Sequence, residues 1–223
     1  MKRKIKCYTA YTTSLYRLLG VVLIPCAFWL LCVILLWSKY GGFTGAGQTS
    51  DVTVYGLYFP LSAYIITYEI FTDYWVLGGC LSDAGRGLRY FRTSRSGVEV
   101  MRNIALVDLF RRFLYCMIFS AIIFVTTGWK TAIVMGPAMY CMIVGVLNVS
   151  RHIDGLQRSV GIAFLAQIGM VIVNIVNVTL IDLAGGGEVI MLVFLAVLYC
   201  AAALCVSGFM IRRITVRVQG LKD

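Results

Sequence analysis

The sequence predicts an all-α integral membrane protein, and three observations lead to that class. Of the 223 residues, 60% are hydrophobic and only 13% are charged, and the mean hydropathy is +0.86. The apolar residues form long uncharged runs of about 17–25 residues, the length that a helix needs to cross the hydrocarbon of a bilayer. None of these runs shows the alternation of a membrane β-barrel strand. Helices must then make the backbone hydrogen bonds that lipid cannot supply.

Six such runs predict six membrane spans in a single transmembrane domain that covers residues 1–223. The spans are expected at about residues 18–38, 52–75, 109–129, 131–150, 159–181 and 189–211. Between the second and third spans, the polar segment 76–108 is predicted to be a loop. Because each arginine at the bilayer centre costs about 2.5–3.5 kcal/mol on the insertion scale, this arginine-rich segment must face water or another protein.

The distribution of basic residues predicts the orientation of the spans. When the six spans alternate and the N-terminus is placed inside, only Lys39 and Lys130 of the 20 lysines and arginines fall on the outer side. Such a bias predicts that both termini and the 76–108 loop are cytoplasmic, and that the chain is a multi-pass protein of a bacterial cytoplasmic membrane. The net charge of +10 then reflects topology and contact with anionic lipids, and it gives no reason to expect nucleic-acid binding.

Polar residues inside the predicted spans are the candidates for a translocation path: Glu69, Asp73, Gln167, Asn174 and Asn177. The two carboxylates lie four residues apart and share one helix face, and ionisable groups at membrane depth are usually functional. The alternative is that both sit at the inner interface and pair with Arg17 or a loop arginine. The three amides share a face of the fifth span, and that face is expected to pack against other helices.

Within the loop, the sequence predicts a short amphipathic helix. Ser96 and Glu99 have the spacing of a capping box, in which each side chain bonds a free backbone N–H of the other residue. After the cap, Val98, Met101 and Ile104 recur at helical spacing and form an apolar stripe. This helix is expected to lead into the third span at Leu109.

The motifs of common enzymes are missing from the sequence. His152 is the one histidine in the chain, so neither an HExxH zinc motif nor a histidine cluster is possible. The chain contains no GxSxG nucleophile elbow and no GxxxxGK[ST] phosphate-binding loop. We therefore expect no catalytic residue, no metal site and no nucleotide bound by the chain itself.

The topology and the loop helix together resemble the permease subunit of an ABC-2 type exporter. In that family the loop after the second span carries a coupling helix, and the segment Arg95-Ser96-Gly97-Val98-Glu99-Val100-Met101-Arg102 is similar to it. The basic start, Lys2 to Arg17, resembles the family's N-terminal interfacial helix. The resemblance implies that the residues that contact a separate ATPase subunit are Arg95, Ser96, Gly97, Val98, Glu99, Met101 and Arg102.

If the resemblance holds, the ATPase subunits bind ATP and Mg²⁺, and a second permease copy or a paralogue completes the transporter. The cargo expected from the apolar, aromatic-rich spans is an amphipathic, lipid-like or peptide molecule that is moved out of the cell. Two alternatives stay open at this point. One is the substrate-binding subunit of an energy-coupling-factor importer, and the other is a small intramembrane enzyme.

Overall fold

In the computed structural model, the described part of the chain is helical and contains no strand. The description excludes residues 1, 41–50, 74–95, 151–159, 186–188 and 220–223. The helices are α1 (Lys2–Tyr11), α2 (Ser14–Tyr16), the π-helix η1 (Arg17–Leu23), α3 (Ile24–Tyr40), α4 (Asp51–Thr72), α7 (Gly97–Thr127), α8 (Ala132–Ser150), α9 (Val160–Gly185) and α10 (Val189–Gln219). The predicted all-α class is confirmed, and the described residues of the six predicted spans are largely helical, with η1 and α3 together covering the first.

Among the described helices, three are long and apolar enough to cross a membrane by length and composition. They are Ser14–Leu35, Gly97–Thr127 and Val189–Arg213. Two shorter apolar stretches, Ala132–Asn148 and Gln167–Ile181, lie within α8 and α9. These features support a membrane protein.

The helix predicted within the loop does lead into the third span, but the two are one continuous element. A single helix, α7, runs unbroken for 31 residues from Gly97 to Thr127. No proline or glycine interrupts the chain between Gly97 and Leu109, so nothing stops the helix once it has begun. It ends at Gly128, whose φ of 69° is the left-handed conformation that closes many helices.

The start of α7 differs from the prediction in one detail. Ser96 is the residue that precedes the helix, as expected, but its side chain makes no capping hydrogen bond. Glu99 instead forms an ion pair with Arg3 of α1, at 3.3 Å between Arg3 Nη2 and Glu99 Oε2. The capping box is therefore not formed, because its glutamate is used to contact another helix.

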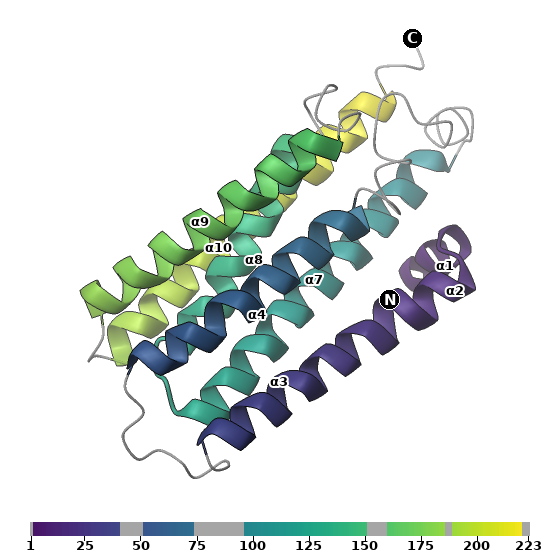
Figure 1. Cartoon of the computed structure of the whole chain (residues 1–223). Helices are drawn as coiled ribbons and strands as arrows, with labels where there is room; N and C mark the ends of the chain where they lie inside the picture. The colour runs from purple at the N-terminus through teal and green to yellow at the C-terminus, as the bar shows by residue number, and fades with distance from the viewer. Residues whose placement is uncertain (1, 41–50, 74–95, 151–159, 186–188, 220–223) are drawn as a thin grey trace.

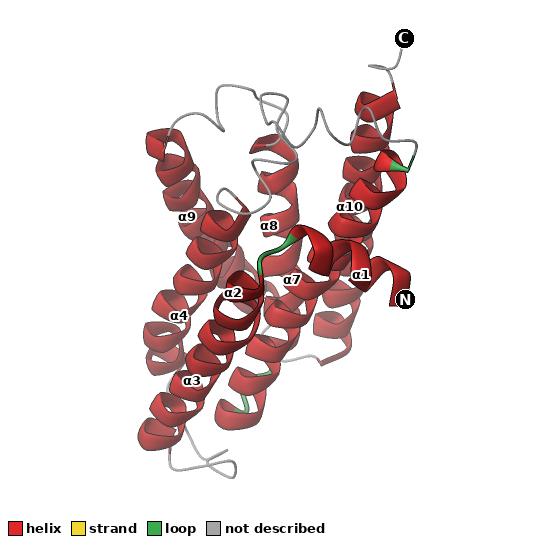
Figure 2. Cartoon of the chain, turned by 90° about the vertical axis from the view of Figure 1, so that its right-hand side faces the viewer, coloured by secondary structure: helices red, strands yellow, loops and turns green. Residues whose placement is uncertain are grey.

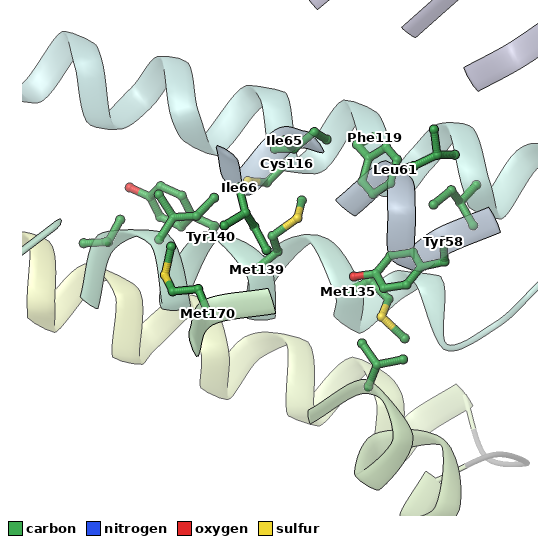
Figure 3. Close-up of a cluster of buried hydrophobic side chains, with 14 of the residues drawn as sticks. Tyr58, Leu61, Ile65, Ile66, Cys116, Phe119, Met135, Met139, Tyr140 and Met170 are labelled. Carbon is green, nitrogen blue, oxygen red and sulfur yellow. The ribbon is translucent and has the colours of Figure 1, made fainter. Parts of the chain in front are cut away.

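The long helices run side by side, with α8 in the middle (Figure 1). Residues 134–140 of α8 are all buried, which is the mark of a helix enclosed on every side. It packs chiefly against α7 and α10, and α4 joins it in the core. Figure 3 shows this core, in which Ile65 and Ile66 of α4, Phe119 of α7 and Met139 of α8 meet.

Toward one end of the bundle, α1 bends away from the line of α2 and α3 and packs on α7 (Figure 2). Tyr8 of α1 is buried with Met101 and Ile104 of α7 in a small cluster of its own. The first turns of α7 are therefore covered by the N-terminal helix.

Small residues let α7 and α8 approach closely. Ala132 and Gly136 of α8 face Cys116 and Ser120 of α7, and the Ser120 hydroxyl donates to the Ala132 carbonyl. Close approach through small residues, with hydrogen bonds across the contact, is how helices associate where lipid weakens the hydrophobic driving force. A Cβ placed on Gly136 would lie 3.0 Å from the Cys116 carbonyl oxygen and 2.9 Å from Ser120 Cβ.

We predict that Gly136→Ala separates α7 from α8 and lowers the free energy of unfolding by about 1–3 kcal/mol, since a backbone carbonyl cannot move aside. Thermal unfolding of the purified protein in bicelles measures the change. Gly169→Ala is the matched control, because no atom lies within 4 Å of a Cβ added there. Equal unfolding temperatures for the two variants would contradict this account of the contact.

Candidate functional site

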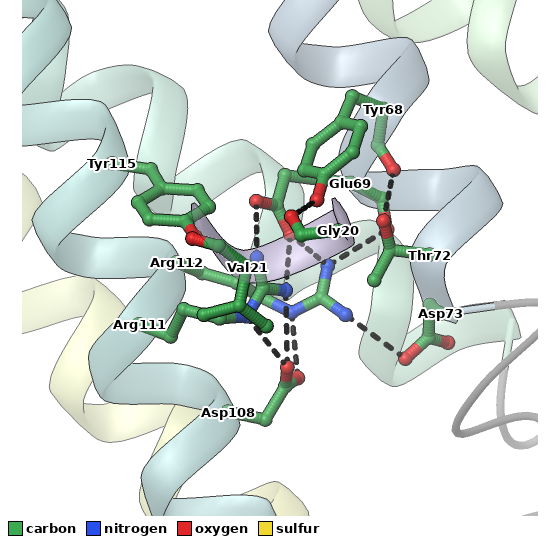
Figure 4. A network of polar contacts seen from close by, with 10 residues as sticks. All are labelled: Gly20, Val21, Tyr68, Glu69, Thr72, Asp73, Asp108, Arg111, Arg112 and Tyr115. Atoms are coloured by element: carbon green, nitrogen blue, oxygen red, sulfur yellow. Dashed lines mark hydrogen bonds and ion pairs between the residues drawn. The ribbon is translucent and has the colours of Figure 1, made fainter. Parts of the chain in front are cut away.

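Five charged side chains are buried together where the C-terminal end of α4 meets α7 (Figure 4). Glu69 lies on α4, and Asp73 is the first residue after the end of α4 at Thr72. Asp108, Arg111 and Arg112 lie on α7 at spacings of three and four residues, which place them on one helix face. Because ionisable groups are rarely buried without a role, this charged cluster is the candidate functional site.

Arg111 joins the two helices by a bidentate contact. Its Nη1 donates to Glu69 Oε1 at 3.0 Å, and its Nη2 donates to Glu69 Oε2 at 2.8 Å. The same guanidinium contacts Asp108 Oδ1 from Nη2 at 3.1 Å and from Nε at 3.3 Å. Its Cζ also lies 5.0 Å from the centre of the Tyr115 ring. A planar guanidinium can make the bidentate contact and the cation–π contact at once, whereas a lysine could not form the bidentate fork.

Arg112 is the most enclosed member of the charged cluster, with none of its side chain exposed. Its Nε contacts Asp108 Oδ2 at 2.7 Å, and its Nη1 contacts Glu69 Oε2 at 2.7 Å. The same Nη1 donates to the backbone carbonyl of Glu69 at 2.8 Å, and Nη2 reaches Asp73 Oδ1 at 3.3 Å. Arg112 thus holds the last turn of α4 through backbone and side chain together.

The pairing decides what this site can do chemically. Each of the three carboxylates contacts at least one guanidinium, so the charges are paired within the chain. Removing one partner from a buried pair leaves an uncompensated charge, at a cost of about 3–5 kcal/mol. The geometry therefore favours a rigid mechanical link between two helices.

A second set of polar contacts, from two tyrosine hydroxyls, ties the same region to the π-helix. Tyr68 of α4 donates to the Gly20 carbonyl, and Tyr115 of α7 donates to the Val21 carbonyl (Figure 4). These hydroxyls lie beside the charged cluster, since Tyr68 precedes Glu69 and Tyr115 stacks on Arg111. The charged cluster is thereby joined to the first long helix of the chain.

Pro25 explains why these two carbonyls need tyrosine donors. In a π-helix the Gly20 carbonyl would accept from residue 25, and in an α-helix the Val21 carbonyl would accept from residue 25 as well. Proline has no N–H and can serve neither. The Ile24 N–H bonds to the Leu19 carbonyl, five residues back, as the π pattern requires. Without the tyrosines, two buried carbonyls would lack a donor, and such groups are costly in hydrocarbon.

The α1 helix covers the approach to the charged cluster from the N-terminal side. Burial raises the pKa of the Tyr8 hydroxyl, so Tyr8 stays neutral near Asp108 and Arg111. Arg17 donates to the Thr9 carbonyl and does not pair with the carboxylates. Glu69 and Asp73 do pair with arginines, but the partners are Arg111 and Arg112.

The residues predicted to couple to an ATPase lie at the start of α7, except for Arg95, which falls outside the described residues. Ser96 and Arg102 are exposed, and Val98 and Glu99 are half-buried. Gly97 and Met101 are buried, and Met101 packs against Tyr8 of α1. In this conformation Met101 and Ile104 of the predicted apolar stripe are therefore enclosed by the chain itself.

The predicted polar face of the fifth span does pack against other helices. Gln167 Nε2 donates to the Thr67 hydroxyl, and Asn174 Nδ2 donates to Ser62 Oγ at 3.0 Å, both on α4. Asn177 Oδ1 accepts from the Tyr199 hydroxyl of α10 at 2.6 Å. The structure therefore separates these amides from Glu69 and Asp73, whose partners lie on α7.

The sequence does contain a signal for the charged cluster. The spacing of Asp108, Arg111 and Arg112 places them on one helix face at the start of the third span. Glu69 and Asp73 form the complementary pair at spacing four on the preceding span. Two charged faces of opposite sign on consecutive spans are the pattern that predicts an interhelical ion-pair cluster.

No group of three or more histidine, cysteine, aspartate or glutamate side chains is arranged to hold a metal ion in the described part of the chain. The sequence matches no protein-family model, and neither a curated protein nor a solved structure is significantly similar to it. The contacts within the chain are therefore what bear on its function.

We predict that Arg112→Gln lowers the free energy of unfolding by about 3–5 kcal/mol, because buried carboxylates lose their shared partner. Arg102→Gln on the same helix is the matched control. Arg102 is exposed, and its loss should change stability by no more than about 0.5 kcal/mol. Unfolding of both variants in bicelles measures the difference. A destabilisation by Arg112→Gln as small as that of the control would show that the charged cluster is not a structural link.

Proposed function

We propose that the chain is the membrane-spanning subunit of an ATP-binding-cassette exporter that is driven by a separate ATPase. In this proposal six helices, formed by η1 with α3, and by α4, α7, α8, α9 and α10, cross the bacterial cytoplasmic membrane. Both termini and the start of α7 face the cytoplasm. A second permease copy or a paralogue completes the transporter, and ATP and Mg²⁺ bind to the ATPase alone.

The positions of the helix ends support this topology. The N-terminal ends of α1 and α7 and the C-terminal end of α10 lie toward one end of the bundle, and the ends of α3 and α7 near Trp37 and Trp129 lie toward the other (Figure 1). Six basic residues lie near the helix ends at the first of these two ends of the bundle: Arg3, Lys4, Lys6, Arg102, Arg212 and Arg213. A basic inner end and tryptophans near the outer end agree with the usual pattern.

The outer surface of the bundle supports contact with lipid. Large apolar side chains are exposed along α3, α9 and α10, among them Leu30, Phe164, Ile190 and Leu204. A water-soluble protein rarely exposes an apolar surface that is so continuous. The cargo proposed is amphipathic, lipid-like or peptide, because it must pass between helices whose faces are mainly apolar.

The observation that carries the proposal is the continuity of α7. The predicted coupling segment and the third apolar run are one helix, and the charged cluster lies at their junction. A movement imposed on Ser96–Arg102 would be transmitted along a rigid rod to Arg111 and Arg112. From there the ion pairs would carry it to α4, and the tyrosine hydroxyls would carry it to the π-helix.

The contact with α1 adds a condition to this coupling. Met101 is covered by Tyr8, so the ATPase would meet α1 and α7 together, through the residues that stay exposed. Arg102 is such a residue. Val98→Asp would disturb the packing of Tyr8 on α7 as well as the docking of the ATPase. It would therefore not distinguish a loss of docking from a loss of the α1–α7 contact.

We predict that Arg102→Glu abolishes co-purification of the proposed partner ATPase and its stimulation by the permease. The substitution reverses a charge on the exposed rim, where charges set the choice of partner, and it leaves the buried contacts of α7 in place. Co-purification and ATP hydrolysis by the reconstituted complex are the measurements. Arg213→Glu is the matched control, since Arg213 is also exposed, on α10.

Labelling of single cysteines in a cysteine-free background tests whether the variant keeps its topology. Ser38→Cys should react with an impermeant maleimide in sealed cells, and Ser96→Cys should react only after permeabilisation. Wild-type recovery of the ATPase by Arg102→Glu, or ATP hydrolysis by the isolated chain, would refute the proposed function.

A further inference from the structure

The α1 helix has one side on the bundle and another side that faces outward. Tyr8 is buried with Met101 and Ile104 of α7, and the half-buried Cys7 and Tyr11 pack against the same cluster. Three basic side chains and one large apolar side chain are exposed on the rest of the helix, and they are Arg3, Lys4, Lys6 and Ile5. While it packs on α7, α1 therefore presents a basic surface on its outer side.

The direction of α1 is fixed by contacts at its junction with the first long helix. The Thr13 side chain caps α2 by accepting from the Tyr16 N–H at 3.2 Å. The Arg17 guanidinium of η1 donates back to the Thr9 carbonyl of α1. As a result α1 lies across the direction of the long helices, beside α7 (Figure 2). This is the orientation of a helix that lies in the plane of a membrane surface.

The chain does little to neutralise the basic surface of α1. Arg3 pairs with Glu99, but the side chains are 77% and 42% exposed, and ion pairs in water are weak. Neither Lys4 nor Lys6 forms an ion pair with any residue that the structure describes. The charges of the helix thus stay available to an anionic partner.

Apolar side chains continue from this basic surface onto the first long helix. Leu15 of α2, and Leu18 and Leu19 of η1, are exposed and follow α1 closely along the chain. An anionic phospholipid at this corner would place its phosphate beside the lysines and its acyl chains along the leucines. A water-soluble acidic partner would match the charges but not the leucines, so a lipid surface fits better.

We propose that the basic surface of α1 docks on the anionic headgroups of the inner leaflet, and that this contact clamps α1 onto the start of α7. The helix then lies between the headgroups on one side and Met101 and Ile104 on the other. The inference goes beyond the proposed function, because it needs only this chain and a bilayer. Its consequence is that the charge of the membrane sets how firmly Met101 is covered.

Spin labelling of the full chain in lipid nanodiscs tests the docking without any ATPase. Ile5→Cys in a cysteine-free background carries a nitroxide, whose collisions with oxygen and with a water-soluble nickel chelate distinguish lipid from water. Nanodiscs of phosphatidylcholine alone are compared with nanodiscs in which about a third of the lipid is phosphatidylglycerol. The control label is at Leu30→Cys, on the exposed side of α3, which should lie in lipid in both kinds of nanodisc.

We expect the label at residue 5 to be protected from the nickel chelate in anionic nanodiscs and accessible to it in neutral ones. Lys4→Gln with Lys6→Gln should lower the ratio of docked to undocked helix by roughly 25-fold, because each basic residue near an anionic surface contributes a factor of about five. The matched control is Arg212→Gln with Arg213→Gln, which removes two exposed charges from α10 and should leave the response unchanged.

Disulfide crosslinking tests whether the docked helix stays on α7. Cys7 Sγ lies 4.0 Å from Asn103 Nδ2, so Cys7 and Asn103→Cys, kept as the two cysteines of the chain, should form a disulfide on oxidation. If the headgroups clamp α1 onto α7, this disulfide should form faster in anionic nanodiscs than in neutral ones.

The proposal is overturned if the label at residue 5 is equally accessible to the nickel chelate in both kinds of nanodisc, or if Lys4→Gln with Lys6→Gln responds like the wild-type chain. Crosslinking that is no faster in anionic nanodiscs would also overturn it, since the headgroups would then not hold α1 on α7. Because no ATPase is present, failure here leaves co-purification of the ATPase unaffected, and the two proposals can fail separately.

Discussion

The ion pairs between α4 and α7 are the constraint on which the rest of the structure depends. Glu69, Asp108, Arg111 and Arg112 are almost wholly buried, and removing any one of them would leave an uncompensated buried charge. Their pairing fixes the register of the two helices, because the fork of Arg111 fits Glu69 in one orientation only. The charged cluster thus fixes the position of α7. Both α8, which packs closely on α7, and α1, which covers its start, depend on that position.

The same requirement, that each buried polar group has a partner, explains features far from the charged cluster. Pro25 removes a donor from the first long helix, and the hydroxyls of Tyr68 and Tyr115 supply the missing hydrogen bonds. The hydroxyls of Ser62 and Thr67 donate to carbonyls of their own helix, so they accept hydrogen bonds from the amides of α9.

Much of the fold could be predicted from the sequence because it depends on local patterns. Runs of apolar residues gave the positions of the helices, and the spacing of Gln167, Asn174 and Asn177 gave a face that does pack against other helices. The sequence predicts a helix that leads into the third span, but the charged residues before Leu109 give no local sign that the helix continues unbroken to Thr127. Which arginine meets Glu69 depends on how two helices are placed in space, and spacing along the chain cannot decide it. The cover of Met101 by Tyr8 joins residues that are distant in sequence, so no local pattern could show it.

A double-mutant cycle on Glu69→Gln and Arg111→Gln tests the central claim most directly. Each variant and the double variant would be unfolded in bicelles, and the coupling free energy taken from the four stabilities. If these side chains form the link between α4 and α7, the second substitution should cost about 1–3 kcal/mol less once the first is present. Additive costs, within about 0.5 kcal/mol, would show that the two residues act independently and would contradict the account.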